Sequence, residues 1–292
     1  MLNIKLSKSI TIFDFAFKNH EMKKSKLGLL LLLQFFLVFN CKKQDTPIKP
    51  NIIYILADDL GYGDLSLTGQ EKFSTPNIDK LAADGMFFTQ HYSGSTVCAP
   101  SRSALMTGQH TGHTFIRGNR EVKPEGQHPL NASEITVAEL LKSAGYTTGA
   151  FGKWGLGAPA SHGDPNNQGF DEFYGYNCQR IAHNYYPYHL WHNQTKIMLE
   201  GNSGKKTETY APELIHEQAL SFIEKNKDTT FFMYYPTIIP HAELVAPETY
   251  MEMFRGKLLP ENKYKGKDYG DKNYKMGGYA SQDEPHTAFA AM

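Results

Sequence analysis

Segments with strand character alternate with segments of helix character after residue 50, and this alternation restricts the chain to a small set of folds. Residues 51–57 are a continuous apolar run, which predicts a strand buried on both faces. Residues 146–151 and 230–235 are rich in β-branched and aromatic side chains and predict two further strands. Strands separated by helices indicate an α/β domain, in which a sheet is flanked by helices.

Helix signals occupy the connections between these strands. A threonine-proline start and a following glycine predict a helix over residues 76–84. Thr136 and Glu139 form a capping-box pattern, so a helix is expected over residues 136–144. A third, amphipathic helix is expected over residues 213–225.

Side chains that can do chemistry come soon after each predicted strand, at Asp58, Lys153 and His241. Parallel strands in an open α/β sheet have their carboxyl ends at one edge, and binding sites form at that edge. We therefore expect these three side chains to lie close together.

The acids Asp58 and Asp59 are adjacent in the chain and follow the first strand directly. Neighbouring carboxylates repel each other unless a cation holds them, and hard oxygen ligands suit calcium or magnesium. A polar turn with two solvated acids is the alternative interpretation.

A lone cysteine, Cys98, stands at the start of a further predicted helix. Pro100 suits a first helical position and Gly108 supplies a stop, so Cys98 is expected at the helix N-terminus. The free backbone N–H groups there favour an anion, and Arg102 adds a guanidinium that can bind two oxygens at once. This combination suits a site for sulfate or phosphate esters.

The same residues resemble the motif of a known family. Cys98-Ala99-Pro100-Ser101-Arg102, followed by Leu105 and Thr107-Gly108, is similar to the sulfatase motif in which the cysteine is oxidised to formylglycine (3-oxoalanine). Three other segments match the family in the same order, namely residues 51–64, 75–85 and 145–157. The resemblance extends from Lys49 to the last residue. It implies a type I, formylglycine-dependent sulfatase with the sheet of the alkaline phosphatase-like superfamily.

The resemblance implies a metal site and a maturation step. Asp58 and Asp59 would bind a divalent cation, Ca2+ rather than Mg2+, beside the oxidised residue 98. A formylglycine-generating enzyme would have to oxidise Cys98, because an unmodified thiol cannot complete the reaction cycle.

The resemblance also assigns catalytic roles to four residues. Hydrated formylglycine from Cys98 would attack sulfur while Arg102 and Lys153 hold the sulfate oxygens, and His241 would protonate the leaving alcohol. The alternatives are a surface lysine at a strand end for Lys153 and an ordinary loop histidine for His241.

Gly155 departs from the commonest family pattern, which has a histidine two residues after the lysine. The proton-handling role of that histidine is therefore unassigned in this chain. His162 follows nearby and is a possible substitute, but a loop histidine without a catalytic role is the favoured interpretation.

The beginning of the chain has the pattern of an export signal. Basic residues at 23–26 precede an apolar run that ends at Asn40-Cys41 and is too short for a membrane-spanning helix. We expect a mis-annotated start over residues 1–21, a lipoprotein signal peptide over 22–41 and a polar tether over 42–50. The expected location is the periplasm or outer membrane of a Gram-negative bacterium, with a lipid anchor at Cys41. A buried helix is the alternative.

Composition excludes some classes of partner. The formal charge is zero and no basic stripe is present, so no nucleic-acid partner is expected. Three cysteines do not form a disulfide framework, and Cys178 is expected to be a partly buried thiol without a function.

Residues 173–191 are dense in tyrosine, histidine and asparagine. Aromatic faces and amides suit sugar recognition by a loop, and a packed loop covering the core would have the same composition. Residues 256–278 are expected to form an exposed excursion.

The last residues, 286–292, begin an amphipathic helix, and residues 51–292 are expected to be a sulfatase catalytic domain incomplete at its C-terminus. The expected activity is hydrolysis of sulfate esters, on a sulfated carbohydrate or an aryl sulfate. The alternatives are a phosphomonoester or phosphonate hydrolase of the same superfamily, which rates on matched esters would distinguish, and an inactive lipoprotein that binds glycans.

Overall fold

The computed structural model describes residues 49–204, 206–262 and 282–292, which belong to a unit extending from Lys49 to Met292. The predicted signal peptide and nearly all of the tether lie outside the described residues, as does most of the predicted excursion at 256–278. In the part of the chain that is described, no helix is long and apolar enough to cross a membrane.

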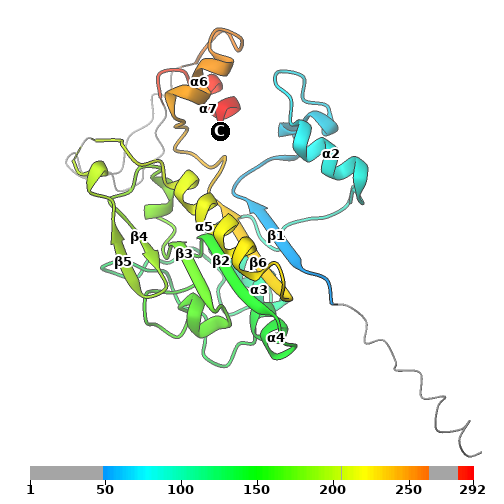
Figure 1. Cartoon of the computed structure of the whole chain (residues 1–292), viewed down its shortest axis with the longest axis vertical. Helices are drawn as coiled ribbons and strands as arrows, with labels where there is room; N and C mark the ends of the chain where they lie inside the picture. The colour runs from blue at the N-terminus through cyan, green and yellow to red at the C-terminus, as the bar shows by residue number, and fades with distance from the viewer. Residues whose placement is uncertain (1–48, 205, 263–281) are drawn as a thin grey trace, which may run out of the picture. The chain divides into compact units, whose positions relative to one another are not determined.

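One six-stranded sheet organises this unit (Figure 1). Its spatial order is β1-β6-β2-β3-β4-β5, so the first strand of the chain pairs with the last one. Neighbouring strands from β1 to β3 run parallel, whereas β4 and β5 form an antiparallel extension. In that order the strands are Ile52–Ala57, Phe231–Thr237, Thr147–Lys153, Glu172–Tyr176, His189–His192 and Thr195–Met198.

The strand register places the polar side chains predicted at strand ends along one edge. Ala57, the residue before Asp58, pairs with Thr237 at the end of β6. Lys153 is the last residue of β2 and pairs with Tyr176 at the end of β3. The shared edge of these parallel strands is therefore where the site forms.

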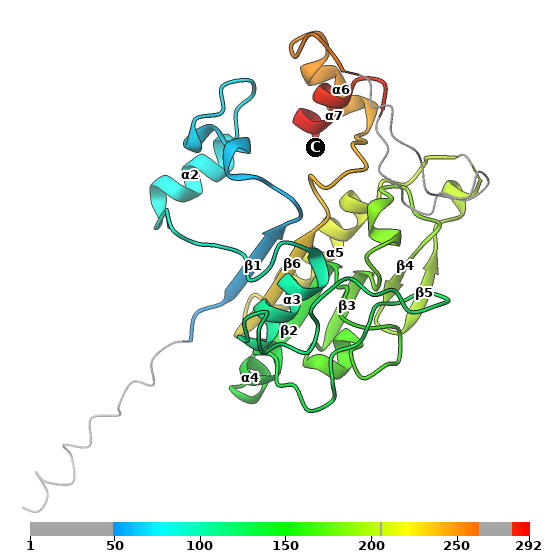
Figure 2. The same ribbon diagram turned by 180° about the vertical axis from the view of Figure 1, so that it is seen from behind.

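Helices cover both faces of the sheet. Helix α5, Ala211–Asn226, crosses one face (Figure 1), and α3, Cys98–Thr107, lies on the opposite face (Figure 2) together with α4, Val137–Ser143. The remaining α-helices are α2 (Pro76–Asp84), α6 (Glu248–Phe254) and α7 (Pro285–Ala291). The 3-10 turns are η1 (Tyr62–Asp64), η2 (Ser66–Thr68), η3 (Pro165–Gln168), η4 (Ile181–His183) and η5 (Glu200–Asn202).

Alternate residues of each central strand belong to two different cores. Phe231 and Met233 of β6 pack with Phe222 of α5, whereas Phe232 and Tyr234 pack with the helices of the other face. Each such side chain contributes roughly 1.5–3 kcal/mol when fully buried. The two cores hold the sheet, and hence its functional edge, between two helical layers.

Most predicted elements are confirmed within one or two residues. Helix α2 matches the prediction, and α4 has the expected capping box, in which Glu139 N–H donates to Thr136 Oγ1 and Thr136 N–H to the Glu139 carboxylate. Helix α3 begins at Cys98 and ends at Thr107, directly before Gly108 as expected, although Pro100 is its third residue rather than its first. Proline is tolerated there because first-turn N–H groups have no partner within the helix.

The expectation that the first strand is buried on both faces is wrong. Ile53 and Ile55 are 46% and 61% exposed, because β1 is an edge strand that pairs only with β6. Among the described residues, no helix covers these two side chains.

Residues 173–191 are not a surface loop. The segment includes most of β3, the turn η4 and part of β4, and most of its side chains are buried. The packed interpretation is therefore confirmed for much of the segment, although Trp191 at its end remains partly exposed.

Gly152 is required where β2 passes β6, directly before Lys153. Its φ is +134°, and an added Cβ would lie 2.1 Å from the carbonyl oxygen of Pro236. We expect Gly152→Ala to lower the free energy of unfolding by about 3 kcal/mol, through overpacking and backbone strain. Urea unfolding measures this, and Gly63→Ala is the control because no atom lies within 4 Å of its added Cβ. Equal effects of the two substitutions would contradict the packing argument.

Candidate active site

A buried carboxylate, Asp58, connects the elements of the site. Arg102 Nη2 donates to Asp58 Oδ1 at 2.9 Å, and Lys153 Nζ donates to Asp58 Oδ2 at 2.6 Å. The three residues are 5%, 2% and 0% exposed. Burial alone would raise the pKa of Asp58, but the two cations hold that pKa far below its usual range. Asp58 is therefore ionised at every physiological pH and links β1, α3 and β2.

Cys98 begins helix α3, where the preceding Val97 has an extended backbone. The N–H of Ala99 donates to Asn119 Oδ1 at 2.9 Å, which occupies one of the free donors of the first turn. The guanidinium of Arg102, one turn along, also donates to the carbonyl oxygen of Lys153. The predicted placement of a cysteine at a helix start beside an arginine is confirmed.

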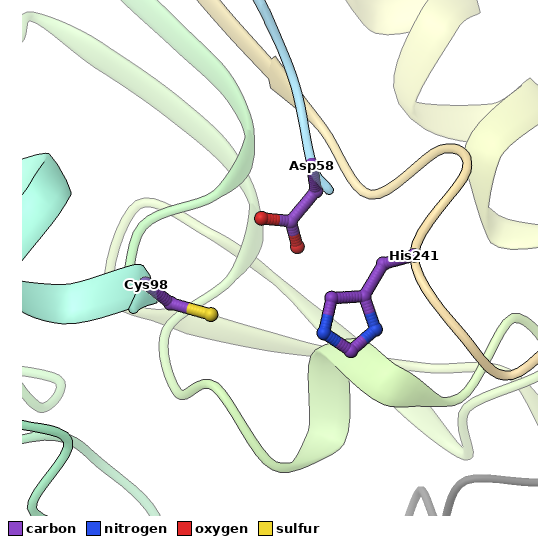
Figure 3. Close-up of side chains that lie close together, drawn as sticks. All are labelled: Asp58, Cys98 and His241. Atoms are coloured by element: carbon purple, nitrogen blue, oxygen red, sulfur yellow. The ribbon is translucent and has the colours of Figure 1, made fainter. Parts of the chain in front are cut away.

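The thiol of Cys98 points toward Asp58 and His241 (Figure 3). The ligand atoms of the three side chains all lie within 4.8 Å of one another, and Lys153 Nζ lies 3.4 Å from Cys98 Sγ. Burial raises the pKa of the thiol, but the hydrogen bond with His241 and the charge of Lys153 outweigh burial and lower the pKa. The centre thus favours an anion at residue 98.

A cavity of about 190 Å³ opens beside this group. Asp58, Asp59, Thr96, Cys98 and Arg102 are among the residues that line it. The cavity gives a small anion access both to the thiol and to the arginine at the helix start.

His241 follows β6 and is 2% exposed. Its Nε2 lies 3.3 Å from Asp59 Oδ2, whose side chain is 63% exposed. The phenol of Tyr185 donates to the carbonyl oxygens of Ile238 and His241, at 2.9 and 2.7 Å, and so holds this loop against the core.

His183 is a residue of the centre that the sequence analysis did not single out. Its ring stacks on that of His241, with 4.4 Å between centroids and 18° between planes. Burial and the nearby positive charge of Lys153 lower the pKa of His183 to about 3. His183 is therefore neutral at physiological pH. In the sequence, the only indication of a role for His183 was its position in the aromatic segment 173–191, which also contains other histidines.

Gly155 offers no room for the histidine that stands there in the commonest family pattern. Its φ is +76°, and an added Cβ would lie 1.8 Å from Nε2 of Gln179, which is itself buried. Gln179 therefore fills the space where a side chain at position 155 would start. His162 is exposed, in agreement with the favoured interpretation of it as an ordinary loop residue.

The structure therefore brings Asp58, Cys98, Arg102, Lys153 and His241 into one group, with Asp59 at its rim. Two buried cations, a helix N-terminus and a reactive position in a small cavity form an arrangement that can bind a tetrahedral oxyanion.

Comparison with known proteins agrees with this geometry. The family model described as Sulfatase matches residues 50–276. The chain belongs to the sulfatase family. The alkaline phosphatase-like fold predicted from the sequence is likewise confirmed by solved sulfatase structures.

Among relatives of this chain, mouse (Mus musculus) N-acetylgalactosamine-6-sulfatase is 35% identical over 223 residues, which are 70% of this chain and 42% of the mouse protein. The crystal structure of Ps i-CgsB in complex with k-i-k-neocarrahexaose is 30% identical, with a TM-score of 0.62, and the match covers 83% of this chain and 53% of that one. BT4656 in complex with D-glucosamine-2-N,6-O-disulfate is 26% identical, with a TM-score of 0.59, and the match covers 74% and 39% of the two chains. The chain thus spans about half the length of these relatives.

The charge network around Asp58 predicts that removing this carboxylate lowers the stability of the fold. Asp58→Asn leaves Arg102 and Lys153 buried without their counterion, so we expect the free energy of unfolding to fall by about 3–5 kcal/mol. Urea unfolding in a buffer that contains a metal chelator measures this change in the free energy of unfolding. Asp84→Asn is the control, because Asp84 pairs with Lys80 at the exposed surface and its loss should change little. If both variants unfold like the parent, the network does not stabilise the fold.

The two cysteines of the described residues should differ in reactivity. Cys98 is partly exposed with a lowered pKa, so its thiolate persists at lower pH than that of a free cysteine. Cys178 is fully buried, and burial raises its pKa to about 11. Iodoacetamide between about pH 6 and pH 9 should alkylate Cys98 and spare Cys178. Peptide mass spectrometry measures both sites, and protein unfolded in urea is the control in which both react. Modification of Cys178 in folded protein would contradict the burial described.

Proposed function

We propose that the protein hydrolyses sulfate esters of a sulfated carbohydrate, with residue 98 in the formylglycine form. The observation that carries this proposal is the buried group in which Arg102 and Lys153 share Asp58 beside Cys98 at a helix start. The names of the relatives support it, because they include an N-acetylgalactosamine-6-sulfatase and a protein bound to a disulfated glucosamine.

The arrangement of donors fits a hard divalent cation. Asp58 and Asp59 both line the cavity, whereas the donor atoms that lie within 4.8 Å of one another belong to Asp58, Cys98 and His241. Sγ of Cys98 stands where formylglycine would present an oxygen. Carboxylate oxygens suit Ca2+, which accepts irregular coordination, better than they suit a soft metal. Asp58, Asp59 and residue 98 would hold the ion. When bound, it supplies positive charge that polarises the sulfate ester.

We assign binding of the sulfate oxygens to Arg102 and Lys153. Both side chains are buried and fixed by Asp58, so they need no reorganisation when charge develops on those oxygens. The guanidinium offers a planar set of donors and the ammonium a point charge, which together suit a tetrahedral group.

His241 is placed to move a proton. One ring face stacks on His183, and its carbonyl oxygen is held by Tyr185, so the imidazole is held beside Asp58 and Cys98. We assign it to protonation of the leaving alcohol. His183 stays neutral and adds no positive charge next to this proton.

Formylglycine formed from Cys98 supplies a hydrated aldehyde whose hydroxyl is the nucleophile. The start of helix α3 orients this group, and the hydrogen bond that the N–H of Ala99 donates to Asn119 Oδ1 fixes the first turn. The proposal requires a maturation enzyme, and the basic and apolar residues before Cys41 support export with a lipid anchor there.

The mass of the peptide that contains residue 98, in protein from the native host, tests this proposal. Conversion of thiol to aldehyde lowers the mass by about 18 Da, and the aldehyde should react with a carbonyl probe. The converted protein should release sulfate from sulfated oligosaccharides in a cation-dependent way, whereas Cys98→Ala should release none. An unmodified thiol in native protein, or turnover by Cys98→Ala, would show that the reaction is a different one.

A further inference from the structure

A second cavity, of about 480 Å³, lies outside the catalytic group. It is lined by basic, acidic and aromatic side chains, among them Lys123, Glu125, Arg180, His189, Trp191 and Lys196. None of these residues takes part in the proposed reaction.

The second cavity opens on the same face of the sheet as the catalytic helix. Trp191 packs against the core that includes Ala99 and Met106 of α3, whereas its neighbour Leu190 belongs to the core under α5. The turn η4 joins the two sites, because Ile181 lines the second cavity and His183 stacks on His241. The two sites are therefore connected by one short turn of the chain.

Glu125 fixes the aromatic wall of this cavity. Its carboxylate accepts hydrogen bonds from Trp191 Nε1 and pairs with His189 Nε2, each at 2.7 Å, and its side chain is 12% exposed. Lys196 Nζ lies 3.6 Å from the same carboxylate and 5.1 Å from the centroid of the Trp191 ring. The indole is thus held in place before any ligand arrives, which reduces the entropy cost of binding.

Basic side chains outnumber acidic ones at this cavity. Glu125 is shared among several donors, and Arg180 pairs with Glu121 at 2.6 Å. Lys123 is exposed, and no acidic side chain among the residues that the structure describes forms an ion pair with it. The cavity therefore combines an aromatic surface with excess positive charge.

We propose that this cavity binds an anionic sugar residue adjacent to the one whose sulfate ester is cleaved. The apolar ring face of a sugar can pack on the indole, its hydroxyls can bond to polar side chains of the wall, and its sulfate or carboxylate group can pair with Lys123 and Lys196. The inference rests on the proposed function and narrows it, because it favours oligosaccharides over simple aryl sulfates.

Binding can be measured without catalysis, on the full chain carrying Cys98→Ala. Sulfated hexasaccharides of carrageenan, chondroitin sulfate and heparin are titrated by calorimetry and by tryptophan fluorescence. The fluorescence reports on this site because Trp154, the other tryptophan, is 1% exposed in the core. We expect at least one probe to bind saturably with a change in Trp191 emission, and added salt should weaken it because exposed charges are screened.

Substitutions locate the binding site. Trp191→Phe should remove the emission change, and Lys123→Ala and Lys196→Ala should each weaken binding by about 10-fold through loss of a charged hydrogen bond. Lys142→Ala is the matched control, because it removes the same charge from α4, where Lys142 pairs with Asp171. Thermal melting shows which variants remain folded.

Three results would overturn the proposal: no probe binds, maltohexaose binds as tightly as the sulfated probes, or Lys142→Ala weakens binding as much as the cavity variants. These outcomes are separate from failure of the proposed function, which is measured at residue 98. Binding at Trp191 together with an unconverted thiol would retain the sugar site and remove the sulfatase activity.

Discussion

The buried carboxylate of Asp58 is the interaction on which the site depends. It directly follows β1, accepts hydrogen bonds from Lys153 at the end of β2 and from Arg102 of α3, and so connects three elements. Burying either cation at nearly zero exposure would be costly without such a partner, because isolated charges lose their hydration. The same pairs keep both cations directed toward residue 98. Stability and the capacity to bind an oxyanion therefore arise from one contact.

Sheet order explains how distant parts of the chain reach this contact. β6 is formed late in the chain but pairs with both β1 and β2, so the carboxyl ends of all three strands share one edge. Parallel pairing with helical crossovers makes this arrangement general for such sheets. β2 also passes close to β6 at Gly152, where the two strands approach so nearly that no side chain fits. That approach brings Lys153 to the centre.

The sequence was sufficient for the elements whose determinants are local. Capping residues and strand ends predicted α4 and the positions of Asp58 and Lys153, because periodicity and caps act over a few residues. The exposure of Ile55 was not predictable, because a continuous apolar run has the same sequence pattern in an edge strand as in a central strand. The stacking of His183 on His241 depends on tertiary packing across 58 positions, and no local pattern marks it.

The balance of positive and negative side chains differs between the two cavities, and so do the roles that we propose for them. In the centre, the carboxylates of Asp58 and Asp59 offset the cations Arg102 and Lys153, so these side chains alone provide little net attraction for a sulfate group. Under the proposed function, a divalent cation held by Asp58, Asp59 and residue 98 would add net attraction there, and contacts beyond the centre would add more. Exposed lysines such as Lys123 can attract a polyanion from a distance, but salt screens them. Salt screens the buried cations Arg102 and Lys153 much less, and they act at contact distance. We thus assign recognition of the sugar chain to exposed groups and stabilisation of the reacting sulfate to buried groups. Because these groups lie in different dielectric surroundings, either role can change without the other.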